Sequence, residues 1–179
     1  MNTALRYGPP ESFSDDELSR MRGLIARTWP PIPGQAPREI SPSASWERRM
    51  VAAVFDGDEV VAHAQSFART IDAAGTRMVI LALAGVCVEA ACRGHGLGSA
   101  VVRANLARVD CGEFPLALYQ TKVPGFYEQL GARITTSRIV NSLHPTDPGR
   151  PPFWEPFAIV YPAPARWPEP DVDLLGLGY

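Results

Sequence analysis

The segment Cys87–Leu106, CVEAACRGHGLGSAVVRANL, holds three glycines within five residues, after an arginine and before an apolar helix pattern. A strand, a glycine turn and a helix N-terminus together form an anion site, because unpaired amide groups and the positive end of the helix dipole converge there. Glycine also lets the main chain approach an anion that a side chain would keep away. A tight turn needs only one glycine, so three glycines beside Arg93 favour phosphate binding.

Two common phosphate-binding patterns do not fit this loop. The dinucleotide pattern G-x-G-x-x-G requires a third glycine or alanine where this chain has Ser99 or Val101. The P-loop pattern fails because no Gly-Lys-Ser/Thr is present. What remains is Arg93-x-x-Gly96-x-Gly98, with Val88 five residues before the arginine.

Length and composition exclude several classes of protein. The 179 residues suit one domain, and a net charge of −2 gives no basic excess for nucleic acid. The longest apolar run, residues 78–88, is too short to span a bilayer, and the N-terminus does not resemble a secretory signal. Three cysteines without metal-like spacing to histidine predict reduced thiols in a cytoplasmic protein and no metal site.

Hydrophobic periodicity and turn residues predict an α/β order that starts with antiparallel strands and turns parallel at the glycine loop. Ser14 is the predicted cap of the first long helix, and Asp56-Gly57-Asp58 predicts a hairpin turn. In the helix after the loop, Arg103 and Arg108 are expected to face out. The predicted strands are 5–7, both arms of 51–70, 76–90, 115–120, 133–143 and 157–162; the helices are 14–29, 41–50, 97–109 and 125–130.

The C-terminal segment is rich in proline and aromatic residues. Nine of the 18 prolines lie between Pro145 and Pro170. Phe153, Trp154 and Trp167 are too apolar for a disordered tail. We therefore expect residues 1–179 to form a single domain, with 145–179 packed on it.

The segment Val88–Gly98, VEAACRGHGLG, resembles the signature V-x-P-x-x-R-G-x-G-x-G of the GNAT superfamily of N-acetyltransferases, with Ala90 in place of the proline. Thirty residues on, FYEQLGARI resembles the Y-E-K-L-G-F segment of that family, with Gln120 and Val123 at its usual Asn and Ala positions. The resemblance covers about residues 55–139. It implies a mixed central sheet, antiparallel in its N-terminal half, with a splayed parallel pair at the acyl-CoA site and flanking helices.

Within the superfamily, residues 60–94 look closest to the aminoglycoside 2′-N-acetyltransferases, and more weakly like nodulation-type acyltransferases. The shared features are an Ala-His-Ala strand and the Gly-Val-x-Val strand end. One departure is Ala84, where the aminoglycoside enzymes carry a glutamate. The substrate or the mode of proton removal would then differ.

The resemblance also implies roles for individual residues. Acetyl-CoA would be the cosubstrate and Tyr127 the general acid. Its thioester and pantetheine would bind the main chain of Val86, Cys87 and Val88. The other coenzyme contacts would be Arg93, Gly94, His95, Gly96, Leu97, Gly98, Ser99 and Gln120, most of them at the pyrophosphate.

The acceptor side is less constrained by the motifs. His63 and Gln65 share one strand face, and together with Ala84 and Trp154 they are the predicted substrate contacts. Candidate bases are Glu155, set between Trp154 and Pro156, and the terminal carboxylate of Tyr179. Glu89 is expected to point toward the turn. An ordered water is the alternative to a base supplied by the protein. Covalent catalysis by Cys87 or Cys92 is disfavoured because a cysteine in an apolar strand is usually inert.

These residues predict an acetyl-CoA-dependent N-acetyltransferase acting on a small amine such as an amino sugar, in a possible homodimer. Two alternatives remain open. One is an acyltransferase that takes a longer acyl chain from coenzyme A or an acyl carrier. The other is an acyl-CoA-binding regulatory module without turnover.

Overall fold

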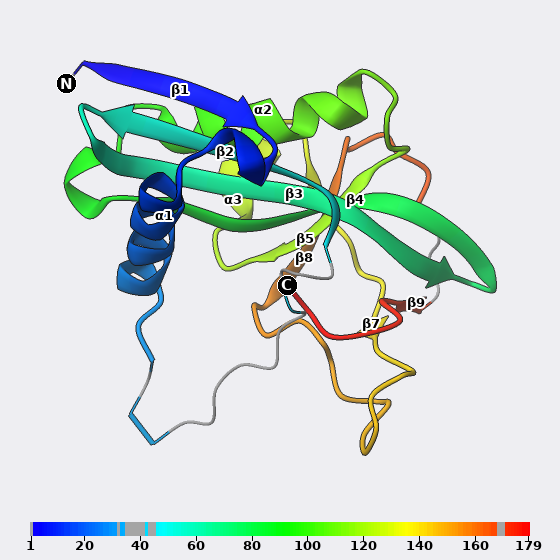
Figure 1. The fold of residues 1–179 in the computed structure, drawn as a ribbon. Helices are drawn as coiled ribbons and strands as arrows, with labels where there is room; N and C mark the ends of the chain where they lie inside the picture. The colour runs from blue at the N-terminus through cyan, green and yellow to red at the C-terminus, as the bar shows by residue number, and fades with distance from the viewer. Residues whose placement is uncertain (1, 32, 35–41, 43–45, 168–170) are drawn as a thin grey trace. The chain divides into compact units, whose positions relative to one another are not determined.

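The computed structural model describes residues 2–31, 33–34, 42, 46–167 and 171–179, which divide into two compact units. Unit 1 holds the described residues within Met1–Pro37, Arg48–Phe67 and Leu83–Ala107. Unit 2 holds those within Arg38–Glu47, Ala68–Ala82 and Arg108–Tyr179. Two long strands, β3 (Glu59–Ala73) and β4 (Thr76–Val88), contribute to both units (Figure 1). A single domain over residues 1–179 stays a prediction.

The strands pair in the order β1-β2-β3-β4-β5-β8-β6, and β9 pairs with both β3 and β7. β4 and β5 are parallel, with Leu81 opposite Ala117, whereas β1–β2, β5–β8 and β6–β8 are antiparallel. The predicted mixed sheet with a parallel pair is therefore confirmed. The other strands are β1 (Thr3–Gly8), β2 (Glu47–Asp56), β5 (Ala117–Thr121), β6 (Arg133–Ile134), β7 (Ile139–Val140), β8 (Phe157–Tyr161) and β9 (Val172–Asp173).

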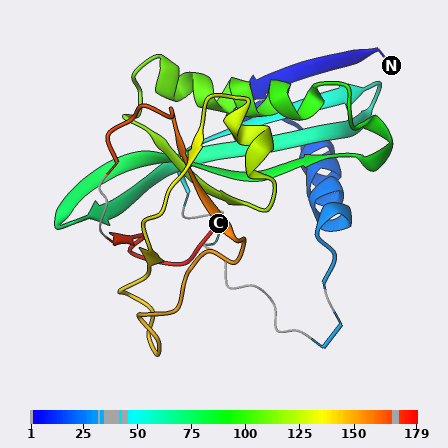
Figure 2. The same ribbon diagram turned by 180° about the vertical axis from the view of Figure 1, so that it is seen from behind.

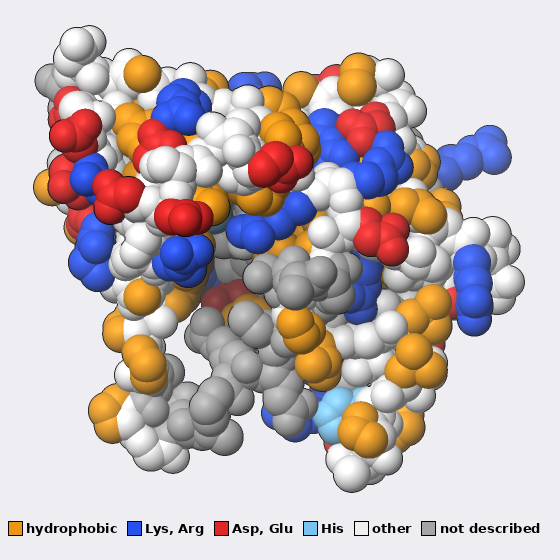
Figure 3. All heavy atoms as spheres, in the orientation of Figure 1, with side chains coloured by type: hydrophobic (Ala, Val, Ile, Leu, Met, Phe, Trp, Pro, Cys, Tyr) orange, Lys and Arg blue, Asp and Glu red, His pale blue; other side chains and the backbone are white. Residues whose placement is uncertain are grey.

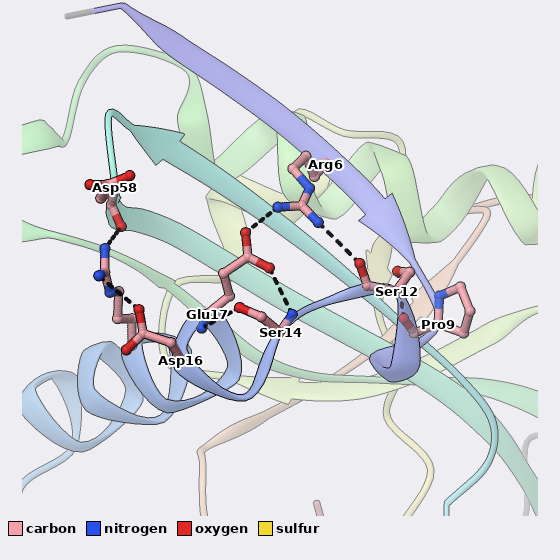
Figure 4. A network of polar contacts seen from close by, with 8 residues as sticks. Arg6, Pro9, Ser12, Ser14, Asp16, Glu17 and Asp58 are labelled. Carbon is pink, nitrogen blue, oxygen red and sulfur yellow. Dashed lines mark hydrogen bonds and ion pairs between the residues drawn. The ribbon is translucent and has the colours of Figure 1, made fainter.

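The first helix, α1 (Asp15–Thr28), begins with a capping box, as its sequence predicts. Ser14 Oγ accepts a hydrogen bond from Glu17 N at 3.2 Å, and Ser14 N donates to Glu17 Oε2 at 2.8 Å. Glu17 also pairs with Arg6 of β1, whose guanidinium donates to Ser12 O at 3.0 Å (Figure 4). One carboxylate thus joins the helix start to the first strand of unit 1.

Helices cover both faces of the strands in unit 1. Figures 1 and 2 show α1 on one face and the second helix, α2 (Leu97–Asp110), on the other. Under α1, Met21 and Leu24 join a buried cluster with Val51, Phe55 and Cys87. The α2 face beneath the strands buries Val101, Val102 and Leu106, as its periodicity predicts.

The predicted hairpin turn and the predicted short helix are both present. β2 and β3 are joined at Gly57, which has a φ of +60°, a conformation that glycine adopts without strain. The short helix α3 (Pro124–Glu128) lies within the predicted range 125–130 except for its first residue, and Gly131, with a φ of +91°, follows it.

The expectation that Arg108 faces solvent is wrong, because its side chain is buried. Its guanidinium donates to both carboxylate oxygens of Glu113, at 2.8 and 2.6 Å, and lies 4.8 Å from the ring centre of Phe114. Burial of an arginine is tolerated when its charge is paired in this way. Arg103 is exposed, as expected.

Three predicted elements also differ in extent. Of the helix expected over 41–50, residues 41 and 43–45 lie outside the described residues, whereas residues 47–50 extend β2, so the helix is wrong there. The strand expected over 133–143 is broken into β6 and β7, because Thr135 Oγ1 accepts from Ser137 N at 3.2 Å and turns the chain between them. The strand expected over 157–162 is present as β8 and ends one residue earlier, at Tyr161.

Figure 3 shows basic and acidic groups interspersed on one face of the molecule, in keeping with the small net charge. None of the helices in the described part of the chain is long and apolar enough to cross a bilayer.

Candidate active site

The glycine loop begins where β4 ends at Val88. Glu89 opens a short 3-10 turn, η3 (Ala90–Cys92), and its carboxylate accepts from Ala90 N at 3.0 Å and from Arg27 Nη2 at 3.2 Å. The bond from the Ala90 amide, more than any other contact, lowers the pKa of Glu89. Glu89 therefore caps the turn and is a weak base at neutral pH.

Arg93 and the glycines after it form an open surface. Arg93 is exposed, and its Nε donates back to Val88 O at 3.2 Å. Gly94 and Gly96 have φ values of +81° and +77°, which other residues adopt only with strain. A Cβ at either glycine would meet no atom within 4 Å. The glycines thus leave space in front of the main chain, which is what a bound phosphate requires.

The start of α2 adds amide donors to this loop. Gly96 O accepts the first helical hydrogen bond, from Ala100 N at 3.0 Å, so the amides of Leu97, Gly98 and Ser99 precede the helical ladder. Gly96 brings no side chain to cap them, and the first turn of α2 carries no acidic residue. An anion bound here would meet main-chain donors and the positive end of a 14-residue helix. The loop residues therefore fit the pyrophosphate group predicted for them.

The other predicted loop and strand residues differ in exposure. Val86 and Val88 are half-buried, whereas Cys87 is only 4% exposed. Burial raises the pKa of the Cys87 thiol to about 12, so hardly any thiolate exists at neutral pH. His95 is exposed, with Nδ1 3.0 Å from Arg93 O. Cys87 therefore lacks the chemistry of a nucleophile.

A buried polar cluster lies beside β4 in unit 1. His63 is 1% exposed, and its Nδ1 lies 2.8 Å from Gly85 O. Gly85 has a φ of +62°, and a Cβ there would lie 3.2 Å from His63 Cε1 and 3.3 Å from Gln65 Nε2. Gln65 Oε1 accepts two hydrogen bonds from Arg49, at 3.0 and 2.6 Å. Ala84 is also buried, and substrate contact by His63, Gln65 and Ala84 stays a prediction.

His63 predicts a pH dependence of stability. Burial lowers its pKa from 6.5 to about 4, so the folded protein keeps the ring neutral where the unfolded chain protonates it. The neutral His63 ring thus makes its full contribution to the free energy of unfolding above pH 6.5. That contribution is lost as pH falls from 6.5 toward 4. The loss is on the order of 3 kcal/mol.

Urea unfolding at pH 7 and at pH 4.5 measures this effect. The His63→Asn variant keeps a donor at the position of Nδ1 for Gly85 O but has no group that titrates in this range, so its free energy of unfolding should fall less than that of the wild type. Equal decreases in the two proteins would contradict the assignment.

In unit 2, Tyr127 lies on α3 with its ring 5% exposed. It packs against Phe126 and Tyr119, each with ring centres 4.8 Å away. Burial raises the pKa of Tyr127, so its hydroxyl stays protonated well above neutral pH. The role of Tyr127 as general acid stays a prediction.

Gln120 joins three other predicted site residues of unit 2. Its Oε1 accepts from Trp154 N at 2.8 Å and from Glu155 N at 2.9 Å, and its Nε2 donates to Tyr179 O at 2.8 Å. Tyr179 is buried, and its hydroxyl donates to Leu118 O at 2.8 Å. Trp154 is 37% exposed, and Glu155 is half-buried. The structure brings these four residues together on unit 2, whereas their roles stay predictions.

Sequence reasoning did not single out Tyr119. It is 1% exposed, and its hydroxyl has no hydrogen-bond partner among the described residues. Tyr119 and Gln120 are successive residues of β5, so their side chains point to opposite faces of the strand. The alternation of side chains along β5 was the signal that could have placed Tyr119 on the face opposite to Gln120.

Comparisons with known proteins identify the family of this chain. The sequence matches the family described as acetyltransferase (GNAT) domain over residues 11–135. No curated protein sequence matches significantly.

Within the part of the chain that the structure describes, no three His, Cys, Asp or Glu side chains gather as metal ligands.

Three solved structures illustrate the shared fold. A GCN5-related N-acetyltransferase from Kribbella flavida is 21% identical with a TM-score of 0.54, over 74% of this chain and 33% of its own. Escherichia coli ElaA is 14% identical with a TM-score of 0.59, over 88% and 97%. A GNAT family acetyltransferase from Brucella melitensis, solved with acetyl-CoA, is 16% identical with a TM-score of 0.55, over 74% and 83%. The chain thus spans about a third of the Kribbella protein.

Proposed function

The chain belongs to the GNAT family of acetyltransferases, and we propose that it transfers the acetyl group of acetyl-CoA to a primary amine of a small molecule. Its mixed sheet, in which β4 and β5 are parallel, is the GNAT fold. The observation that carries the proposal is the open main-chain surface at Gly94 and Gly96, ahead of the first turn of α2. Acetyl-CoA would supply the activated thioester.

The chain's own residues supply binding and proton transfer. The amides from Gly94 to Ser99 and the guanidinium of Arg93 would hold the pyrophosphate, and the main chain of Val86, Cys87 and Val88 the pantetheine. Tyr127 Oη would give its proton to the leaving sulfur. Burial keeps this phenol protonated at neutral pH, as the role of proton donor requires, and also makes it a weaker acid than an exposed phenol.

The base that takes the proton from the amine has three candidates: Glu155, the end of the chain at Tyr179, and an ordered water. Gln120 contacts the main chain of both Glu155 and Tyr179, so these two candidates lie near each other on unit 2. Glu89 is a poorer choice because its carboxylate caps η3.

The finer identity of the substrates is also part of the proposal. An aminoglycoside acceptor rests on residues 60–94 alone, and Ala84 departs from the glutamate of those enzymes. Two alternative functions remain: an acyltransferase that uses a longer acyl donor, and an acyl-CoA-binding module without turnover. A single domain over 1–179, with 145–179 packed on it, and a homodimer complete the proposal.

The test is a thermal-shift titration with acetyl-CoA, followed by an assay of thiol release with a panel of amines. Acetyl-CoA should raise the melting temperature, because a ligand that binds only the folded state stabilises it. At least one amine should then release free thiol. Stabilisation without thiol release for any amine would favour the binding module, and the absence of stabilisation would contradict the function as a whole.

A further inference from the structure

The side chain of His63 contacts the main chain of β4 at Gly85. Its Nδ1 lies 2.8 Å from Gly85 O, which is hydrogen-bond distance. A carbonyl oxygen can only accept, so Nδ1 carries the ring proton and donates it. Burial lowers the pKa of His63 to about 4, so the ring is neutral at neutral pH and Nε2 carries no proton. His63 therefore holds the carbonyl of Gly85 in one tautomer.

Gly85 and the side chains around it fit each other closely. A Cβ at Gly85 would lie 3.2 Å from His63 Cε1 and 3.3 Å from Gln65 Nε2. Arg49 in turn holds Gln65, by donating to Gln65 Oε1 at 3.0 and 2.6 Å. The φ of +62° at Gly85 is a conformation that glycine adopts without strain. The main chain is thus fixed here by a residue without a side chain and by neighbours that fill the space.

The bond to His63 also restricts the direction of the next amide. The peptide unit that joins Gly85 to Val86 is planar and trans, so its C=O and N–H point in opposite directions. Because His63 holds Gly85 O, the N–H of Val86 points away from the histidine. Val86 is half-buried and lies four residues beyond Ala82, which pairs in parallel with β5.

An N–H in a fixed direction is useful for acyl transfer to an amine. The nitrogen forms a bond to the thioester carbon, and an electron pair of the C=O bond moves to the oxygen. When that pair returns, the C–S bond breaks, the sulfur gains a proton and the nitrogen loses one. A preorganised N–H stabilises the negative charge on the oxygen, and loss of one such donor costs about 10²–10³ in kcat.

We propose that His63 is a positioning residue that acts through Gly85 O and directs the N–H of Val86 at the thioester oxygen of acetyl-CoA. The inference rests on the proposed function, in which the main chain of Val86 binds the thioester and pantetheine. His63 acts here through the main chain, so the role does not require the contact with the acceptor predicted for it.

The variants His63→Leu and His63→Asn separate the hydrogen bond from the packing. Leucine and asparagine have similar shapes, but only asparagine has a donor near the position of Nδ1. His63→Leu should lower kcat about tenfold or more, while the KM for acetyl-CoA changes less than about threefold. His63→Asn should restore most of the lost kcat. A wild-type kcat in folded His63→Leu, or equal losses in the two variants, would overturn the proposal.

A second measurement does not depend on turnover. Acetyl-CoA and coenzyme A, which lacks the acyl oxygen, are titrated separately into the full chain while NMR follows the amide of Val86. Acetyl-CoA should shift this amide proton further than coenzyme A does in the wild type and in His63→Asn, but not in His63→Leu. Equal shifts with both ligands in the wild type would overturn the proposal. Thiol release by the wild type with the amine panel separately reports whether the proposed function holds, so turnover together with equal shifts would refute this inference alone.

Discussion

Replacing Tyr127 with phenylalanine is expected to lower kcat about 100-fold or more while acetyl-CoA binds as before. General acid catalysis contributes about 10²–10⁴ in rate, and the variant loses only the proton donor. The ring and its contacts with Tyr119 and Phe126 remain. Removal of one hydroxyl from a ring that keeps its packing should therefore cost the fold little.

Steady-state assays of thiol release measure this effect, with acetyl-CoA affinity determined separately. Tyr161→Phe is the matched control, since it removes a hydroxyl of the same unit that donates to Asp110 Oδ1 at 2.6 Å. The control should keep its kcat. An unchanged kcat in Tyr127→Phe would remove this tyrosine from the mechanism, and equal losses in both variants would indicate a structural cause.

Much of the loop and its flanking elements could be predicted because local rules govern them. The three glycines after Arg93, the cap at Ser14 and the hairpin at Gly57 each depend on the conformation of a few neighbouring residues. The long apolar strand before the loop also follows from its composition. These features required no knowledge of distant contacts.

Features that depend on contacts outside an element's own residue pattern could not be predicted from the sequence. Arg108 lies at a helical position that periodicity assigns to solvent, but Glu113 and Phe114 bury it. β9 pairs with β3 and β7, which are distant from it in sequence. No local sequence pattern predicts a strand of only two residues. The same holds for Gln120, whose partners lie 34 to 59 residues away.

The Gly96→Trp variant is expected to lose acetyl-CoA binding by about 100-fold or more. A Cβ at Gly96 points into open space, so the indole would occupy the region that the phosphate needs. The positive φ also costs a non-glycine residue about 1–2 kcal/mol. Gly112→Trp controls for that strain, because Gly112 has a φ of +81° and equally open surroundings.

Calorimetric titration of acetyl-CoA into the wild-type, Gly96→Trp and Gly112→Trp proteins tests the central claim most directly. If the glycine loop holds the pyrophosphate, the wild type and Gly112→Trp will bind with similar affinity, and folded Gly96→Trp will give no binding heat. Binding by Gly96→Trp with the wild-type Kd would contradict the account.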